Sequence, residues 1–281
     1  MEVGGLPLRT WTWDGGGATT VLLLHGFLDV GRTWSFVVEA LPDDFDGHVV
    51  ALDWRGHGES GWVGPGGYYH FADYARDLEV VTRAVRRDRL ALVGHSMGAQ
   101  AVGMWLGARP RGADAALLVE GLGPVPLPEA AYPGRMATWL DQTAPFDAER
   151  WLRPMRDLEH AASRLQRLNA RLTPERAARL AGWATTEGPG GGLVWCYDPL
   201  HRTTSPVPVP SAVAAHFWAG VRCPLGWIGG AESRWTGPAL DAWLDGLPLG
   251  LRRHLPGAGH MVQNDQPQAL AAALVEFLAA V

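Results

Sequence analysis

The feature that most restricts the fold is a short apolar run followed at once by a glycine-flanked serine and a helical pattern. Residues 89–93 are typical of a short buried strand, and residues 96–108 of a helix that ends before Arg109-Pro110. Between them stands Gly94-His95-Ser96-Met97-Gly98. A sharp strand-to-helix turn needs small flanking residues and exposes the serine hydroxyl on a strained backbone. We therefore expect Ser96 to be a nucleophile; the alternative is a glycine-rich turn that merely contains a serine.

Strand and helix patterns alternate along most of the chain. Strands are expected at residues 21–24, 48–52, 89–93, 115–120, 224–228 and 251–255, and helices at residues 71–87, 96–108, 238–244 and around Leu270, Leu274 and Phe277. This alternation favours a parallel sheet covered by helices. With 281 residues, 47% of them hydrophobic, the chain can bury one large core. We expect an α/β fold with a mostly parallel central sheet.

The alternation is interrupted between residues 124 and 215. Proline-rich joints separate four expected helices, near residues 132–142, 148–160, 163–172 and 174–184, and the glycine run at 188–192 suggests a hinge or a turn. The pattern predicts a core in two parts, residues 1–123 and 216–281, with residues 124–215 inserted between them as a helical cap.

Charge and composition exclude several partners and mechanisms. The formal net charge is −5 with both signs interspersed, so we expect no nucleic-acid partner. All 24 cationic residues are arginines, which excludes lysine-based mechanisms and suggests a GC-rich, bacterial genome. No window approaches about 18 uninterrupted apolar residues, so we expect a cytoplasmic protein without a membrane span. Cys196 and Cys223 lack metal-ligand spacing. We expect a small-molecule substrate, no metal, no cofactor, and a monomer or homodimer.

Among the ten histidines, His260 is the best candidate for a general base. It lies in a glycine-rich loop directly after an expected strand and shortly before the helix near Pro267. His25, His57 and His95 stand in tight turns, where we expect them to bond to the backbone. A histidine base also needs a carboxylate that holds its correct tautomer.

Four motifs follow the first three expected strands and the last one. They are His25-Gly26-Phe27, Asp53-Trp54-Arg55-Gly56-His57-Gly58-Glu59-Ser60, the turn around Ser96, and Gly257-Ala258-Gly259-His260. In this order and spacing they resemble those of the α/β-hydrolase fold superfamily, over nearly the whole chain outside the cap. The resemblance implies an α/β-hydrolase fold, His260 as the base, and an oxyanion hole formed by the backbone N–H groups of Phe27 and Met97.

The acid departs from the commonest pattern of that superfamily. In most similar proteins a Gly-x-x-Asp turn supplies it, whereas this chain has Gly230-Ala231-Glu232-Ser233 there. Glu120 instead stands at the carboxyl end of the strand after the serine helix, an edge where ligand sites of parallel sheets gather. Some haloalkane dehalogenases similarly use a glutamate at that strand end. We predict Glu120 as the acid, with Glu232 as the alternative and a turn-capping role for Glu120 as a third.

A serine at this turn favours transfer of an acyl group to water. Similar enzymes that act on haloalkanes or epoxides place an aspartate there, so Ser96 argues against those activities. We expect a serine hydrolase of the carboxylesterase type that forms an acyl-enzyme on Ser96. Carbon–carbon bond hydrolysis is an alternative, although similar enzymes often have glycine where this chain has Ala99. A non-catalytic binding protein that keeps the fold is a further alternative.

Specificity is expected to come from the cap and the loops at the sheet edge. His25, Trp34, Trp139, Trp183 and Trp235 are the candidate pocket residues, for an apolar or aromatic acyl group. Each tryptophan, taken alone, is more often core packing. Arg164, Arg167 and Arg171 form a helical stripe that suits an anionic substrate, but a solvated helix face explains it as well.

Overall fold

The computed structural model describes residues 1–121 and 127–281. Within these residues one sheet has seven strands, and all its neighbouring strands are parallel except the pair β5 and β3. In spatial order they are β11 (Leu249–Leu255), β10 (Leu225–Gly230), β7 (Ala115–Val119), β6 (Arg89–His95), β4 (Thr19–Leu24), β5 (His48–Leu52) and β3 (Thr10–Asp14). The expected mostly parallel α/β sheet is therefore confirmed.

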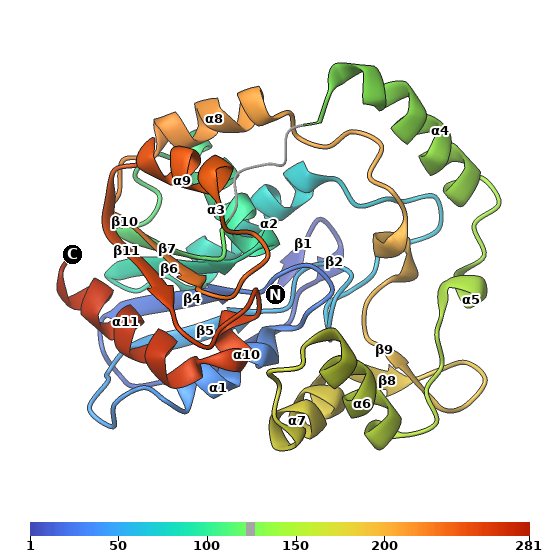
Figure 1. Ribbon diagram of the computed structural model, residues 1–281, viewed down its shortest axis with the longest axis horizontal. Coiled ribbons are helices and arrows are strands. Elements are labelled where there is room, and N and C mark those ends of the chain that lie inside the picture. Colours follow the sequence, from blue (N-terminus) through green and yellow to red (C-terminus); the bar gives the residue numbers. More distant parts are fainter. Residues whose placement is uncertain (122–126) are drawn as a thin grey trace.

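Helices cover both faces of the sheet (Figure 1). One face packs against α2 (Phe71–Val85), α3 (Met97–Ala108), α8 (Ser211–Gly220) and α9 (Pro238–Asp245); the other packs against α1 (Ser35–Val38), α10 (Val262–Asp265) and α11 (Pro267–Ala279). Strands β4 and β7 are buried over almost their whole length, because side chains on both of their faces enter these two cores. That double burial explains why they read as continuous apolar runs rather than as alternating patterns.

The edge strand β3 was not expected from the sequence. It pairs antiparallel with β5, in the register Thr10 to Leu52. Its residues alternate between polar side chains and the two tryptophans Trp11 and Trp13, which pack against the core under one face of the sheet. A small hairpin of β1 (Glu2–Val3) and β2 (Leu6–Pro7) precedes it.

Between β7 and α8, residues 127–210 form an inserted segment that lies beyond one end of the sheet (Figure 1). Its helices are α4 (Tyr132–Thr143), α5 (Ala148–Trp151), α6 (Leu158–Leu168) and α7 (Pro174–Ala184), followed by the hairpin of β8 (Thr185–Glu187) and β9 (Leu193–Trp195). Short 3₁₀ turns lie at Glu129–Ala131 and Pro199–Arg202. Outside the segment, a further 3₁₀ turn at Gly31–Trp34 precedes α1. The expected helix over residues 148–160 is wrong. Pro154 interrupts it, and Met155 pairs with Leu193 at the hairpin instead.

The predicted boundaries of the insertion stay predictions. The first, at residues 123 and 124, lies outside the described residues, and the second, at residues 215 and 216, falls inside α8. The glycine run at 188–192 is the turn of the β8–β9 hairpin, where Gly191 and Gly192 have positive φ. In the described part of the chain, no helix is both long and apolar enough to cross a membrane.

Polar and apolar contacts hold the inserted segment against the sheet's carboxyl edge. Leu172, Ala177 and Leu180 enclose Phe36 of α1 in a small core. The Asn169 amide donates to Asp265 at 2.6 Å, and the Tyr69 hydroxyl donates to Asp198 at 2.7 Å. These contacts place α6, α7 and the turn after β9 next to the loops that follow the central strands.

Candidate active site

Ser96 occupies the turn between β6 and α3, with a backbone φ of 50° and ψ of −112°. Steric crowding requires glycine at both Gly94 and Gly98. A Cβ on Gly94 would lie 2.7 Å from the Ala99 backbone nitrogen, and one on Gly98 would lie 2.5 Å from the Leu24 carbonyl oxygen. The strand and the helix are thus packed too closely for side chains at either position, and the Ser96 hydroxyl is left partly exposed.

The structure brings Ser96, His260 and Glu120 together from three separate loops. The Ser96 Oγ lies 3.1 Å from His260 Nε2, and His260 Nδ1 lies 2.9 Å from Glu120 Oε2. His260 stands between β11 and α10, and Glu120 directly follows β7. The His260 side chain is 26% exposed and that of Glu120 only 2%. In this spatial order, the serine hydroxyl can pass its proton to the imidazole of the histidine, while the buried carboxylate orients the ring.

Three hydrogen bonds hold the Glu120 carboxylate in place. Oε2 accepts from His260 and, at 2.7 Å, from the Ser233 hydroxyl, while Oε1 accepts from the Gly230 backbone N–H at 2.7 Å. The Glu120 backbone has a φ of 50°, a conformation that non-glycine residues rarely adopt. The carboxylate therefore has a fixed direction toward His260.

Glu232, the alternative acid, points elsewhere. Its carboxylate accepts from Arg171 Nε at 2.9 Å and from Arg171 Nη2 at 2.5 Å, and it is 51% exposed. The hydrogen bond from Arg171 lowers the pKa of the Glu232 carboxyl. The structure joins Glu120, and not Glu232, to the histidine.

The backbone N–H groups expected to form an oxyanion hole lie at the ends of two neighbouring elements. Met97 is the first residue of α3, where helical N–H groups lack intrahelical acceptors. Phe27 follows Gly26 in the loop after β4, and a Cβ on Gly26 would lie only 3.3 Å from the Ser96 Cβ. The β4 loop thus lies against the serine turn, as donors to an oxygen bound at Ser96 must.

Three buried histidines brace the surrounding loops, as expected. His25 contacts the Gly26 carbonyl at 2.7 Å and accepts from the Trp54 N–H at 3.1 Å; His57 contacts the Arg55 carbonyl at 3.0 Å. His95 Nε2 lies 2.9 Å from the His260 carbonyl oxygen and so supports the base itself. Burial lowers the pKa of each of the three to about 3, which keeps the rings neutral.

Two of the five candidate pocket residues are wrong, because their side chains are fully buried. His25 is committed to backbone groups, and Trp34 is 0% exposed within the core beside α11. Trp139 packs against Tyr68 and Trp183 against Phe36, at ring separations of 5.5 and 5.3 Å. The Trp235 ring lies 6.4 Å from that of His260, so it is the candidate nearest the site.

Two hollows open beside Ser96 and His260, and Phe27 borders both. The first, of about 470 Å³, is lined by Ser96, Met97, several aromatic rings and the turn after β9, including His201 and Thr203. The second, of about 820 Å³, is lined by His260, Trp195 and residues of α6 and α7. Sequence analysis missed His201 and Thr203, since the turn that carries them has no apolar periodicity; its one signal was Asp198-Pro199. A mostly apolar hollow of about 370 Å³, lined by Met104, Phe217 and Trp218, shares Phe71, Gln100, Arg135 and Ser205 with the first.

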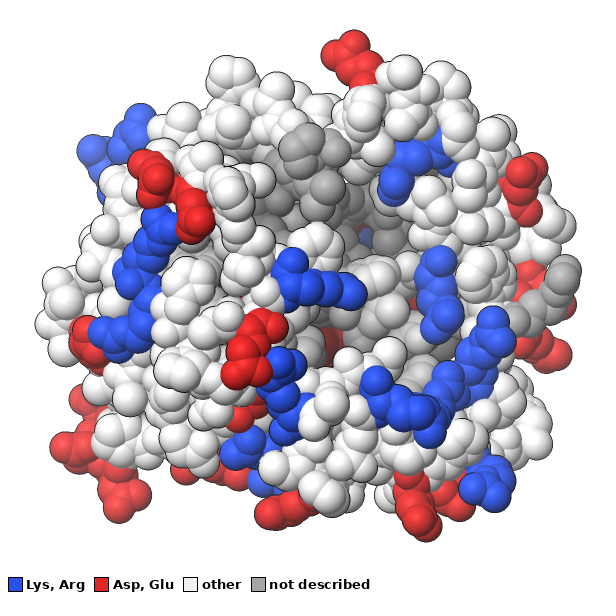
Figure 2. All heavy atoms as spheres, in the orientation of Figure 1, with Lys and Arg blue, Asp and Glu red and all other residues white. Residues whose placement is uncertain are grey.

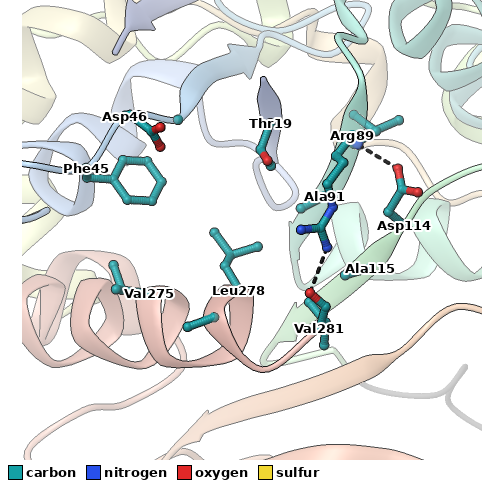
Figure 3. Close-up of a pocket in the computed structure, with 13 residues that line it drawn as sticks. Thr19, Phe45, Asp46, Arg89, Ala91, Asp114, Ala115, Val275, Leu278 and Val281 are labelled. Carbon is teal, nitrogen blue, oxygen red and sulfur yellow. Dashed lines mark hydrogen bonds between the residues drawn. The ribbon is translucent and has the colours of Figure 1, made fainter. Parts of the chain in front are cut away.

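A further cavity, of about 240 Å³, lies at the opposite edge of the sheet (Figure 3). Thr19, Arg89 and Ala115 begin the strands β4, β6 and β7 there. The Arg89 guanidinium donates to the Val281 carbonyl at 2.7 Å, and Asp114 accepts from the Leu90 N–H at 2.8 Å. The residues that line this cavity include no histidine and no cysteine, so it offers no nucleophile and base to match the other edge.

Comparisons with known proteins find relatives among hydrolases and uncharacterised structures. The chain is 30% identical to a serine hydrolase-like protein of Danio rerio over 193 residues, 68% of this chain and 59% of that protein. It is 27% identical to epoxide hydrolase A of Mycobacterium tuberculosis, over 99% of this chain and 96% of that one. A solved structure of a hypothetical protein from Pseudomonas aeruginosa PAO1 superposes with a TM-score of 0.87 at 29% identity, covering 100% of this chain and 97% of that one.

The chain spans only 59%, 48% and 31% of the first three curated relatives, all serine hydrolase-like proteins. The match to a family model covers most of this chain. The model of the alpha/beta hydrolase family matches residues 21–273, which include most of β4, all of β5, β6, β7, β10 and β11, and the loops that carry Ser96, Glu120 and His260. With the sheet order, the serine turn and this match, the chain belongs to the alpha/beta hydrolase family.

Proposed function

We propose that the protein is a serine hydrolase that cleaves carboxylic esters, with an apolar or aromatic acyl group, through an acyl-enzyme on Ser96. The observation that carries the proposal is the continuous hydrogen-bonded series from the Ser96 hydroxyl through both nitrogens of His260 to the buried Glu120 carboxylate. His260 is the base and Glu120 the acid of this series. Phe27 and Met97 donate their backbone N–H groups to the oxyanion.

The reaction follows from these positions. His260 Nε2 accepts the hydroxyl proton as Ser96 Oγ attacks the ester carbonyl, and the oxyanion forms beside the start of α3. His260 then returns that proton to the leaving group as the ester bond breaks. A water molecule, deprotonated by the same nitrogen, attacks the acyl carbon. The bond to Ser96 Oγ then breaks, His260 returns the proton to Oγ, and the acid is released. Glu120 stabilises the imidazolium in both halves of the reaction.

The hollow beside Ser96 supports an apolar or aromatic acyl group. Tyr68, Tyr69, Phe71 and Tyr74 line it together with Phe27, and it adjoins the apolar hollow that reaches Trp218. The inserted segment closes one side of it through His201 and Thr203, which is the basis for proposing that this segment acts as a cap.

Epoxide hydrolysis, the activity named for the mycobacterial relative, receives less support. Hydrolysis through an alkyl-enzyme ester needs a carboxylate nucleophile at the turn, and this chain has Ser96 there. Carbon–carbon bond hydrolysis and a purely binding role remain outcomes of the test.

The test is the intact mass of the protein after exposure to a fluorophosphonate probe, followed by peptide mapping. We expect one adduct, on Ser96, and none on the Ser96→Ala variant or on heat-unfolded protein. A panel of 4-nitrophenyl esters and a β-diketone then separates ester from carbon–carbon bond cleavage. A folded protein that forms no adduct and turns over none of these compounds would contradict the proposal and favour a binding role.

A further inference from the structure

The hollow beside His260 is surrounded by arginines. Five of them line its 820 Å³: Arg164, Arg167, Arg171, Arg202 and Arg234. They come from α6, from the turn between α6 and α7, from the turn after β9 and from the loop after β10, so they approach the hollow from different sides. Figure 2 shows blue side chains on several sides of the depression in the middle of this face.

Most of this positive charge is not neutralised by the protein. Within residues 1–121 and 127–281, Arg171 is the one of the five that forms an ion pair, with Glu232. The others contact neutral groups: Arg164 donates to the Arg153 carbonyl at 2.9 Å, Arg167 to the Ser163 hydroxyl at 3.2 Å, Arg202 to the Tyr197 hydroxyl at 3.1 Å, and Arg234 lies over the Trp235 ring at 5.0 Å. Four guanidinium groups around one hollow therefore keep donors for an external anion.

The acidic groups of the hollow offset little of this charge. Glu232 is already paired with Arg171. Asp29 is the other carboxyl that lines the hollow, and burial raises its pKa to about 7, so it carries only part of a charge near neutral pH. A cleft lined by one sign of charge concentrates ligands of the opposite sign.

The position of His260 identifies which part of the substrate enters this hollow. When the acyl-enzyme forms, His260 Nε2 must give its proton to the departing oxygen or sulfur atom, so the leaving group lies on the side of the imidazole. His260 lines the arginine hollow, whereas Ser96 and Met97 line the aromatic hollow. Phe27 lines both hollows. The aromatic hollow is lined by a single arginine, Arg135, which donates to the Ser205 carbonyl at 3.0 Å. The five arginines of the other hollow therefore place the leaving group there and the acyl group in the aromatic hollow.

We infer that the natural substrate is an acyl ester or thioester whose leaving group carries phosphate, bound by Arg164, Arg167, Arg202 and Arg234. The inference rests on the proposed function and adds its substrate class. Guanidinium forks match phosphate oxygens in two-bond geometry, and several dispersed arginines suit a leaving group with more than one charged centre. Ser96 Oγ forms the new bond to the acyl carbon, the bond to the leaving group breaks, and His260 protonates that group.

Two thioesters with the same acyl group test the inference. Butanoyl-coenzyme A has a phosphorylated leaving group, and butanoyl-N-acetylcysteamine has a neutral one with the same thiol chemistry. We expect kcat/KM to favour the coenzyme A thioester by at least about tenfold at low salt, because exposed ion pairs contribute a few-fold each. The preference should shrink as ionic strength rises.

The double variant Arg164→Gln/Arg167→Gln should lower kcat/KM for butanoyl-coenzyme A by about tenfold and change that for the neutral thioester by less than about twofold. The matched control is Arg83→Gln/Arg253→Gln, which removes the same net charge from exposed positions paired with Glu79 and Glu276. The control should leave both values unchanged.

The outcomes separate this inference from the proposed function. If Ser96 is acylated by the neutral thioester and coenzyme A confers no preference, or the control variant loses as much as the test variant, the phosphate site is refuted and the hydrolase stands. If neither thioester reacts, calorimetric titration of coenzyme A into wild-type and double-variant protein tests the phosphate-binding site independently of catalysis. Binding that the double variant weakens supports it; absence of binding, or equal binding by both proteins, overturns it.

Discussion

Replacing Glu120 by glutamine exchanges one carboxylate oxygen for an NH₂ group, in a side chain whose two oxygens both accept hydrogen bonds. The Gly230 N–H, buried at Oε1, needs an acceptor, and leaving such a donor unsatisfied costs about 1–3 kcal/mol. The glutamine oxygen therefore takes the Oε1 position, and its NH₂ group takes the Oε2 position beside His260 Nδ1 and Ser233 Oγ. An NH₂ there donates to Nδ1, which forces the proton of the neutral ring onto Nε2.

With a proton on Nε2, His260 cannot accept the Ser96 proton. Loss of the correct tautomer in a serine triad lowers kcat by about 10⁴-fold, and we expect that order of loss for Glu120→Gln. The Ser233 hydroxyl can rotate to accept from the new NH₂ group, so the fold should survive. Circular dichroism and a thermal melt check the fold, and hydrolysis of 4-nitrophenyl butanoate gives kcat.

Glu232→Gln is the matched control, because it makes the same chemical change at the other carboxylate of this region. Glu232 is half exposed and bonded to Arg171, so kcat should change by less than about twofold. The reasoning is refuted if folded Glu120→Gln keeps more than a tenth of the wild-type kcat, or if Glu232→Gln is the variant that loses activity.

Two stability predictions concern the carboxyls of Asp29, which is partly buried, and Asp77, which is fully buried. The folded protein keeps the Asp29 proton up to about pH 7 while the unfolded chain releases it near 3.8, so ionised Asp29 destabilises the fold increasingly between these values. Asp29→Asn removes this effect, so it should raise the free energy of unfolding more at pH 8 than at pH 5. The difference builds up between pH 5 and 7, at up to about 1.4 kcal/mol for each pH unit. Urea denaturation that shows the same change at both pH values contradicts this. Asp77 bonds Arg55 at 2.8 and 2.6 Å, and their side chains are 0% and 7% exposed. Asp77→Asn leaves that guanidinium only its longer ion pair with Asp73, at 3.4 Å, and should cost about 3 kcal/mol; a loss below about 1 kcal/mol in the same assay argues against a buried pair.

The sequence predicts the central sheet well because burial on both faces leaves an unambiguous mark. Strands β4, β6 and β7 are apolar runs that end in glycine-containing turns, and few other structures produce that pattern. The misses occur where local pattern and tertiary contact disagree. Residues 148–160 have helical composition, yet Pro154 and the pairing of Met155 with Leu193 divide them.

The candidate acid and the candidate pocket residues were harder to predict from the sequence than the candidate nucleophile, Ser96. Glu120 and Glu232 both follow strand ends, and only the three-dimensional path of each loop shows that Glu120 faces His260 while Glu232 faces Arg171. Trp34 stands in a loop at the correct edge but turns into the core, since nothing in a single sequence reports which way a loop side chain points. The two hollows are formed by segments far apart in the chain, so their residues carry no joint sequence signal.

Backbone strain connects the fold to the candidate site. Among the described residues, the non-glycine residues with positive φ are Leu28, Ser96 and Glu120, at 59°, 50° and 50°. They follow β4, β6 and β7, which are neighbours in the sheet, and conformations of this kind cost about 1–3 kcal/mol each. Parallel strands place the loops that follow them at the same edge of the sheet. The side chains of Ser96 and Glu120 can approach His260 there only because the chain turns abruptly after each strand. The strain is therefore concentrated where three adjacent strands end, and the packed strands beneath supply the stability that maintains it.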